Sequence, residues 1–286
     1  MTLSTCNANP GCSNRIRRAG LALTMLALSA TTAGAQEVHE RAEDSHEHAD
    51  DHDHGLHFAH PIFTESASPD TKIRLDYART WEEDANENEV EFEAEYAFHR
   101  SFSIELVVPY VSLNPDAAPS ESNLGNVEVA LKFANFAFED SGVLLGYGVE
   151  FGLPTGDDEQ GIGSDHLWEI EPFLNLGVKQ GDWEIQAFSV FGIPTNQDEG
   201  EEIETEFKYD LSTLYHVSDR VQALLELNGE VGLSGDEAGE GVVSLAPGLK
   251  VAPLADRSLF LGVGVSLPLG EQEVDATLRV SAFYHF

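Results

Sequence analysis

Residues 89–99 read EVEFEAEYAFH, and this stretch decides the fold. Glutamate fills every odd position from Glu89 to Glu95, whereas every even position from Val90 to Phe98 is apolar. Because successive side chains of a β-strand point to opposite faces, this alternation predicts a strand with one charged face and one apolar face. Residues 278–286 (LRVSAFYHF), at the end of the chain, repeat the pattern with an apolar or aromatic residue at each even position.

Alternation of this kind recurs along the chain in segments of about 10 to 13 residues, the length that a tilted strand needs to cross a bilayer. Strands of soluble sandwiches are shorter, typically about five or six residues. Short polar turns alternate with mostly longer acidic loops at 81–87, 113–123, 154–164, 195–202 and 233–240. We therefore predict an all-β fold, a transmembrane antiparallel up-and-down β-barrel of about 12 strands that occupies residues 70–286. The predicted strands are residues 71–80, 88–99, 101–112, 124–136, 141–153, 165–178, 182–194, 203–216, 219–232, 241–252, 257–269 and 274–286.

The C-terminal residue supports the same interpretation. Outer-membrane barrels of Gram-negative bacteria commonly end in an aromatic residue that their barrel-assembly machinery reads, and Phe286, preceded by Tyr284 and Val280, fits that pattern. An even number of strands places both chain ends on the periplasmic side. We expect outer-membrane lipid and lipopolysaccharide around the barrel.

Residues 1–35 have the features of a signal peptide. Three arginines between Arg15 and Arg18 precede the apolar run Leu21–Ala30, and Ala33-Gly34-Ala35 is a small-residue cleavage site. Cleavage after Ala35 removes both cysteines of the chain, so we expect neither a disulfide nor a thiolate metal site. The predicted location is the outer membrane of a Gram-negative bacterium.

Composition excludes two classes of protein. The 286 residues contain 15 Lys and Arg against 51 Asp and Glu, a formal net charge of −36, which is incompatible with neutralising nucleic-acid phosphates. No run of about 18 apolar residues is present, which excludes an integral membrane protein built from helices.

Residues 36–69 show no regular period, and seven of the 11 histidines of the chain lie there among acidic residues. We predict a disordered periplasmic extension rich in His, Asp and Glu. No cofactor is required, but imidazole and carboxylate together suit labile Zn, Cu or Ni. The alternative is a solvated leader that binds no metal. The candidate metal ligands are His39, His46, His48, His52, His54, His57, His60, Asp51 and Asp53.

If the apolar strand faces meet lipid, the polar faces line the lumen. An acidic lining attracts cations, although twelve strands lie between the filled eight-stranded barrel and the open porins, so a closed, structural barrel is the alternative. Histidines 99, 216 and 285 share the inward parity near the periplasmic rim, but their strands are too far apart for one metal ion, and we expect interfacial polar residues. The candidate pore-lining residues are Glu91, Glu93, Glu95, Glu105, Glu128, Lys132, Glu169, Glu171, Glu204, Glu206, Lys208 and Arg279.

Several short motifs occur in a characteristic order between residues 71 and 286. They are Val108-Pro109-Tyr110, residues 124–132 (LGNVEVALK), residues 152–157 (GLPTGD), Gly161-Ile162-Gly163, Glu171-Pro172 and residues 181–184 (GDWE). In this order the chain resembles the outer-membrane proteins named for the phenol-degradation meta pathway, although Asn126 stands where that family usually has Asp and Phe133 where Tyr is common. The resemblance implies an outer-membrane barrel that passes small solutes and has no catalytic residues.

These observations favour an outer-membrane channel or transporter for small solutes, with a link to divalent metals through the histidine-rich extension. Two alternatives stay open: a non-conducting barrel that anchors a metal-binding extension, and a passage for small aromatic or hydrophobic compounds. We do not expect an enzyme. Ser164 and His166 share one external loop, but the sequence marks no third partner for them.

Overall fold

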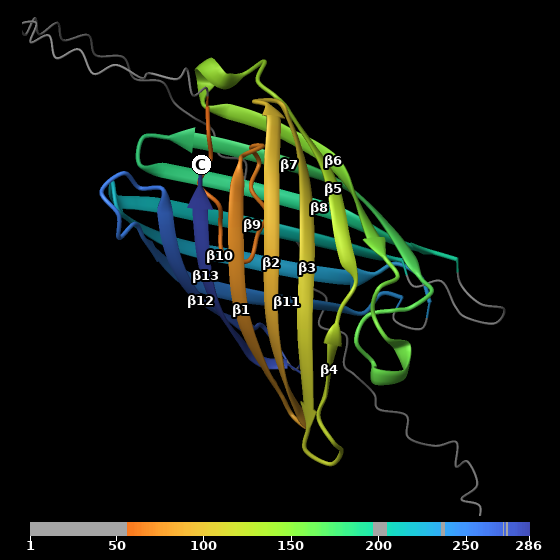
Figure 1. Cartoon of the computed structure of the whole chain (residues 1–286). Coiled ribbons are helices and arrows are strands. Elements are labelled where there is room, and N and C mark those ends of the chain that lie inside the picture. Colours follow the sequence, from red (N-terminus) through yellow and green to blue (C-terminus); the bar gives the residue numbers. More distant parts are fainter. Residues whose placement is uncertain (1–55, 197–204, 236–237, 271, 273) are drawn as a thin grey trace, which may run out of the picture. The chain divides into compact units, whose positions relative to one another are not determined.

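The computed structural model describes residues 56–196, 205–235, 238–270, 272 and 274–286, and within them thirteen strands form one antiparallel sheet. Pairing of β2 with β3 closes this sheet into a barrel (Figure 1). No helix of the described residues has the length and hydrophobicity to cross a membrane. The strands are β1 (Lys72–Glu82), β2 (Ala85–His99), β3 (Phe102–Pro115), β4 (Glu121–Leu124), β5 (Val127–Asn135), β6 (Val143–Leu153), β7 (Trp168–Gln180), β8 (Trp183–Thr195), β9 (Glu206–Ser218), β10 (Val221–Gly232), β11 (Gly241–Val251), β12 (Leu259–Pro268) and β13 (Val274–His285).

The barrel has twelve strand positions because β4 and β5 share one of them. β4 pairs with the second half of β3, and β5 pairs with its first half. The interruption falls at Gly125, whose N–H donates to the carbonyl oxygen of Pro109 at 3.0 Å. A barrel of about twelve antiparallel strands, as the alternation predicted, is confirmed.

The predicted orientation of the strand faces is also confirmed. In β2, Phe92 and Tyr96 are exposed on the outside of the barrel, whereas Glu93 and Glu95 are buried inside it. β13 exposes Val280 and buries Ser281 and Phe283 in the same way. The outer surface is thus an apolar belt suited to lipid, and the charges are enclosed.

The two ends of the barrel differ. β1 pairs with β13 from Lys72 opposite His285 to Glu82 opposite Val274, so the first and last strands begin and end at one rim, which we call the terminal rim. The turns at 100–101, 181–182 and 219–220 lie at this rim. The longer connections gather at the opposite, loop rim. One predicted loop, 81–87, is wrong: β1 and β2 form a long hairpin with only Glu83 and Asp84 between them.

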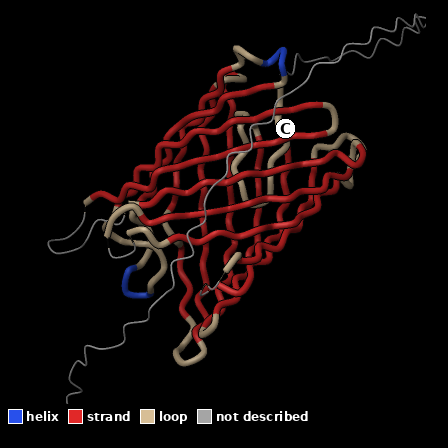
Figure 2. The backbone as a smooth tube through the Cα atoms, turned by 180° about the vertical axis from the view of Figure 1, so that it is seen from behind, coloured by secondary structure: helices blue, strands red, loops and turns tan. Residues whose placement is uncertain are grey.

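Residues 56–70, the luminal segment, run inside the barrel near the terminal rim and are drawn in orange in Figure 1. Figure 2 shows the same segment from behind, enclosed by strands. Phe58, Ile62 and Ala67 are fully buried. The predicted disorder of 36–69 is therefore wrong for residues 56–69, because the barrel wall supplies the partners that these residues lack on their own. Residues 1–55, with the predicted signal peptide and the rest of the extension, lie outside the described residues.

Glycines on the inner wall make room for the luminal segment. A Cβ on Gly177 of β7 would lie 2.6 Å from the ring of Phe58, and one on Gly146 of β6 would lie 2.7 Å from the carbonyl oxygen of Ala67. Ile62 packs in the same way over Gly248 of β11. The wall and the segment are therefore complementary in shape, and a larger side chain at these positions would displace the segment.

Leu174, in the middle of β7 and 57% exposed, tests the lipid-facing assignment. We expect Leu174→Arg to lower the free energy of unfolding in lipid vesicles by about 2–4 kcal/mol, because it places a charge at the bilayer midplane. Leu254→Arg, in the turn between β11 and β12 at the terminal rim, is the control and should cost about 0–1 kcal/mol. Equal costs at the two positions, measured by denaturant titration, would contradict the assignment.

Candidate functional site

The luminal segment has no regular secondary structure, so its buried backbone groups need partners from the wall. One carboxylate supplies three of them. Glu226 of β10 accepts the N–H of Ile62 at 2.9 Å, that of Phe63 at 3.1 Å and that of Thr64 at 2.8 Å. Charge-assisted bonds of this kind are stronger than bonds between neutral groups. Glu226 thus holds the centre of the segment against β10.

Other wall side chains bind the ends of the segment. Gln186 of β8 accepts the N–H of Ala67 at 2.9 Å and donates to the carbonyl oxygen of Ala59 at 2.7 Å. Glu184, on the same strand, accepts the N–H of Ala59 at 2.8 Å. From β7, Asn175 donates to the carbonyl oxygen of Glu65 at 2.9 Å. The two halves of the segment are thereby tied to one side of the barrel.

Basic residues on the other side bind the segment's carbonyl groups. Arg74 of β1 donates to the carbonyl oxygen of Ile62 at 2.6 Å, and Lys250 of β11 donates to that of His60. Polar bonds thus reach the segment from strands around the whole barrel. The segment crosses the lumen and is held from all sides.

Beside the segment, buried glutamates and lysines form one network. Lys72 contacts Glu93, lies 2.6 Å from Glu95 and 3.2 Å from Glu105. Lys132 lies 3.3 Å from the same Glu95 and 3.2 Å from Glu105, and it reaches the luminal segment through Glu65 at 2.7 Å. Removing one member of such a network leaves a buried charge without compensation, at a cost of about 3–5 kcal/mol. Four of the predicted pore-lining residues (Glu93, Glu95, Glu105 and Lys132) belong to this network.

A cavity of about 370 Å³ lies next to the luminal segment, which contributes Phe63, Thr64 and Glu65 to its lining. Its lining contains seven carboxyl groups and four basic groups, so its walls are acidic on balance. The predicted residues Glu91, Glu128, Lys208 and Arg279 lie here, together with Glu150, which the prediction did not include.

Three further predicted residues gather towards the loop rim. Ligand oxygens of Glu169, Glu171 and Glu206 lie within 4.8 Å of one another. Lys208 contacts Glu206 and lies 3.4 Å from Glu171. The remaining predicted residue, Glu204, lies outside the described residues. A second cavity, of about 290 Å³, adjoins this region. Its lining combines apolar side chains, among them Val190, Val242 and Val243, with polar ones such as Lys208 and Asp210.

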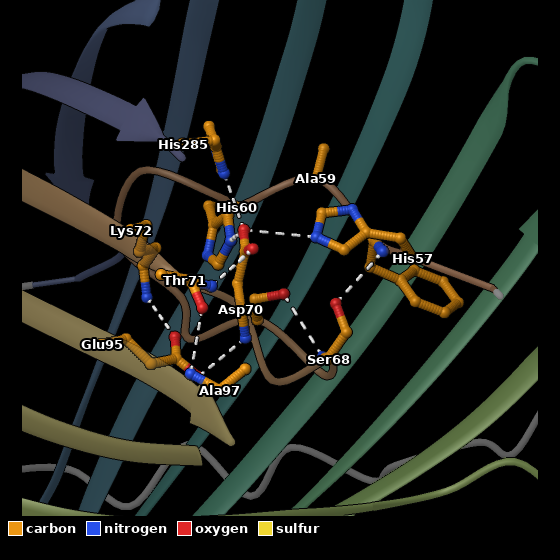
Figure 3. A network of polar contacts seen from close by, with 12 residues as sticks. His57, Ala59, His60, Ser68, Asp70, Thr71, Lys72, Glu95, Ala97 and His285 are labelled. Carbon is orange, nitrogen blue, oxygen red and sulfur yellow. Dashed lines mark hydrogen bonds and ion pairs between the residues drawn. The ribbon is translucent and has the colours of Figure 1, made fainter. Parts of the chain in front are cut away.

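At the terminal rim, three histidines surround one carboxylate (Figure 3). Oδ2 of Asp70 lies 3.3 Å from Nε2 of His57, 3.1 Å from Nε2 of His60 and 2.6 Å from Nδ1 of His285. Burial, with the nearby charge of Lys72, holds the pKa of His60 well below its usual value, so this ring is neutral. Burial alone would raise the pKa of Asp70, but the hydrogen bonds from His285, His57 and His60 lower it below its usual value.

Sequence reasoning identified part of this cluster. His57 and His60 were among the candidate metal ligands, but Asp70 and His285 were not, because they meet only when the barrel closes and the segment folds inside it. The five candidate histidines from His39 to His54 lie outside the described residues, as does Asp51. The three rim histidines do not meet, as predicted: His99 contacts Ser101 at 2.7 Å and His216 contacts Glu184 at 2.8 Å. Asp53 also lies outside the described residues.

The loop between β6 and β7 brings an acid to Ser164 and His166 that sequence reasoning did not find. Asp158 lies 2.7 Å from Nδ1 of His166, and the hydroxyl of Ser164 lies 3.2 Å from the same Nδ1. In a Ser-His-Asp triad the serine and the acid contact opposite ring nitrogens. This arrangement therefore differs from that of a nucleophilic triad.

A closed barrel with an apolar exterior and a charged interior is a transmembrane β-barrel. The family model described as "Putative MetA-pathway of phenol degradation" matches residues 76–283, and the chain belongs to this family. Comparison with curated proteins gave no match.

Solved structures share this fold. An outer membrane channel from Pseudomonas putida F1 is 14% identical, with a TM-score of 0.63 over 84% of this chain and 100% of the channel. The NanC porin is 9% identical, with a TM-score of 0.54 over 74% of this chain and 100% of the porin. The KdgM porin, solved in complex with disordered oligogalacturonate, is 12% identical, with a TM-score of 0.52 over 74% of this chain and 99% of the porin.

Glu226→Ala tests whether wall side chains hold the luminal segment. The change removes the acceptor of three buried N–H groups, and each unsatisfied donor costs about 1–3 kcal/mol. We expect amide hydrogen exchange of residues 62–64 to accelerate by at least about tenfold, while exchange in the strands stays unchanged. The control is Glu169→Ala, on the inner wall near the loop rim, which should leave these amides protected. Unchanged exchange in Glu226→Ala would contradict the assigned role.

Proposed function

We propose that this protein is an outer-membrane channel for small solutes in which the luminal segment acts as a plug. The observation that carries the proposal is the segment itself: it crosses the lumen near the terminal rim, and an acidic cavity lies directly beside it. A structural filling would not need an acidic cavity of this size next to it. Fold similarity to channels and porins is consistent with this function.

The seated segment closes the passage at the terminal rim. It is hydrogen-bonded to β1, β2, β7, β8, β10, β11 and β13, and ion-paired to β5. Solute movement therefore requires the segment to leave its position or to shift within the barrel. A filled lumen also favours a second candidate, a barrel that conducts nothing and anchors the extension.

The wall chemistry favours small cations or neutral polar solutes. Seven carboxyl groups against four basic groups line the main cavity, and an acidic lining repels anions. The apolar side chains in the second cavity near the loop rim, together with the family description, support a narrower substrate class of small aromatic compounds. We propose that the signal peptide directs the chain to the outer membrane, with the terminal rim facing the periplasm. Histidines of the extension would collect divalent ions there, and the barrel-assembly machinery would insert the protein. We propose no enzymatic activity.

Planar-bilayer recording tests the channel. We expect the full mature chain to give small, infrequent conductance steps, and a variant without residues 36–69 to give larger and more frequent ones, because the plug is absent. Glu226→Ala loosens the plug without changing the length of the chain. Its conductance should lie between that of the full mature chain and that of the variant without residues 36–69. If none of the three proteins conducts above the lipid baseline, the channel is excluded and the anchoring barrel is supported.

Selectivity of the same currents tests the role of the acidic wall. Removing two carboxylates from the cavity with Glu91→Gln and Glu128→Gln should lower the ratio of cation to anion permeability, measured as a reversal potential in a salt gradient. The control is the pair Glu121→Gln and Asp116→Gln, outside the cavity in the β3–β5 connection. A permeability ratio equal to that of the unchanged protein would contradict a role of these carboxylates.

A further inference from the structure

The cluster at the terminal rim joins both ends of the luminal segment to the barrel. His57 and His60 begin the segment, Asp70 ends it, and His285 is the last residue of β13. The ring centroids of His57 and His60 lie 6.1 Å apart, and those of His60 and His285 lie 5.4 Å apart. Figure 3 shows the three rings directed at the Asp70 carboxylate.

Hydrogen bonding alone does not account for this arrangement. A carboxylate oxygen has two lone pairs, yet Oδ2 of Asp70 faces nitrogen atoms of three imidazoles. The other oxygen, Oδ1, accepts the N–H of Thr71 at 2.7 Å. One imidazole nitrogen is therefore in excess at Oδ2. A cation between the rings would bind the lone pairs of Oδ2 and of the imidazole nitrogens that are not used in hydrogen bonds.

The two distances from Asp70 are close to those of a zinc site. Ligand atoms about 2.0–2.2 Å from Zn²⁺ at tetrahedral angles lie about 3.3–3.6 Å from one another. Oδ2 of Asp70 is 3.3 Å from Nε2 of His57 and 3.1 Å from Nε2 of His60, and all three ligand atoms lie within 4.8 Å of one another. Small rotations of the rings would bring the three atoms to coordination distance.

The surroundings hold the ligands and leave an entrance. Asp70 is fixed through its N–H, which donates to Glu95 at 3.0 Å, and through His285, whose short contact orients the carboxylate as second-sphere partners of metal ligands do. His60 is 2% exposed, whereas the side chain of His57 is 45% exposed. An ion can therefore enter from the side of His57 and keep water in its fourth position.

We propose that Nε2 of His57, Nε2 of His60 and Oδ2 of Asp70 bind one divalent ion of the Zn²⁺ class, with His285 as the hydrogen-bond partner of Asp70. The ion closes a loop between residues 57 and 70 that contains all the fully buried residues of the luminal segment. Its binding therefore stabilises the seated segment. The site is distinct from labile binding along the extension, since it requires the folded barrel.

The experiment uses the full mature chain in detergent, freed of metal, with the histidines of residues 36–55 replaced so that they cannot compete. In this background, equilibrium dialysis against Zn²⁺ alone should give one ion per chain, and Co²⁺ alone should give the visible absorption of a four-coordinate site. Hydrogen exchange of residues 57–70 should slow when Zn²⁺ is added. The replaced residues are His39, His46, His48, His52 and His54, each changed to Ala.

Single variants in that background identify the ligands. His57→Ala and Asp70→Asn should each weaken Zn²⁺ binding by at least about 100-fold, and His285→Ala by about 10–100-fold with the stoichiometry retained. The control is His99→Ala, because His99 is a rim histidine that contacts Ser101 instead. This change should leave the affinity for Zn²⁺ and the stoichiometry unchanged. Because His57 is half exposed, its loss should leave the barrel folded, which exchange of the strand amides checks. No bound ion in the background protein, or full binding after either His57→Ala or Asp70→Asn, overturns the site regardless of whether the barrel conducts.

Discussion

The structure depends on one constraint: backbone groups that leave water inside the barrel must find hydrogen-bond partners. The luminal segment forms neither helix nor strand, so its N–H and C=O groups cannot satisfy one another. Wall side chains take that role, with Glu226 binding three consecutive N–H groups and Gln186 binding both an N–H and a C=O. The polar faces of these strands are therefore specific to this segment. A lumen filled with water would need no such matching of donors and acceptors.

The same constraint explains the distribution of charge. Buried carboxylates are tolerated where a lysine or a backbone N–H compensates them, as Lys72 and Lys132 do for Glu95 and Glu105. Glu65 completes this network from the segment, so the segment and the wall stabilise each other. Beyond Glu65 the balance changes, because the cavity has more carboxyl groups than basic groups. In the packed half of the lumen each of these carboxylates contacts a lysine, whereas the lining of the cavity keeps an excess of negative charge.

The barrel could be predicted from sequence because its signal is local. Alternation such as that of residues 89–99 fixes which side chains face lipid. A shift of the strand register by one residue would place the glutamates against lipid. The luminal segment was missed because composition was judged over the whole of residues 36–69, where histidine and acid dominate. Two signals for it exist: the large apolar residues Phe58, Ile62 and Phe63 lie close together after the acidic stretch, and inward glycines such as Gly177 and Gly248 recur in strands that otherwise carry side chains. Neither signal says which segment fills the space. The rim cluster could not be predicted from sequence either, because Asp70 and His285 are 215 positions apart and meet only through barrel closure.

The rim cluster and the cavity are coupled through the segment that separates them. A ligand shifts an equilibrium between two conformations only by the difference between its affinities for them. His57 and Asp70 lie close together only while the segment is seated, since twelve residues of chain separate them once it leaves the lumen. Any ion that needs both ligands therefore binds the seated state preferentially and opposes opening. A cation in the cavity beside Glu65 would act differently, because it would compete with Lys132 for that carboxylate and weaken one bond that holds the segment. Under the proposed function, the two ends of the segment would respond to cations in opposite directions, with a closing site at the rim and an opening site in the lumen.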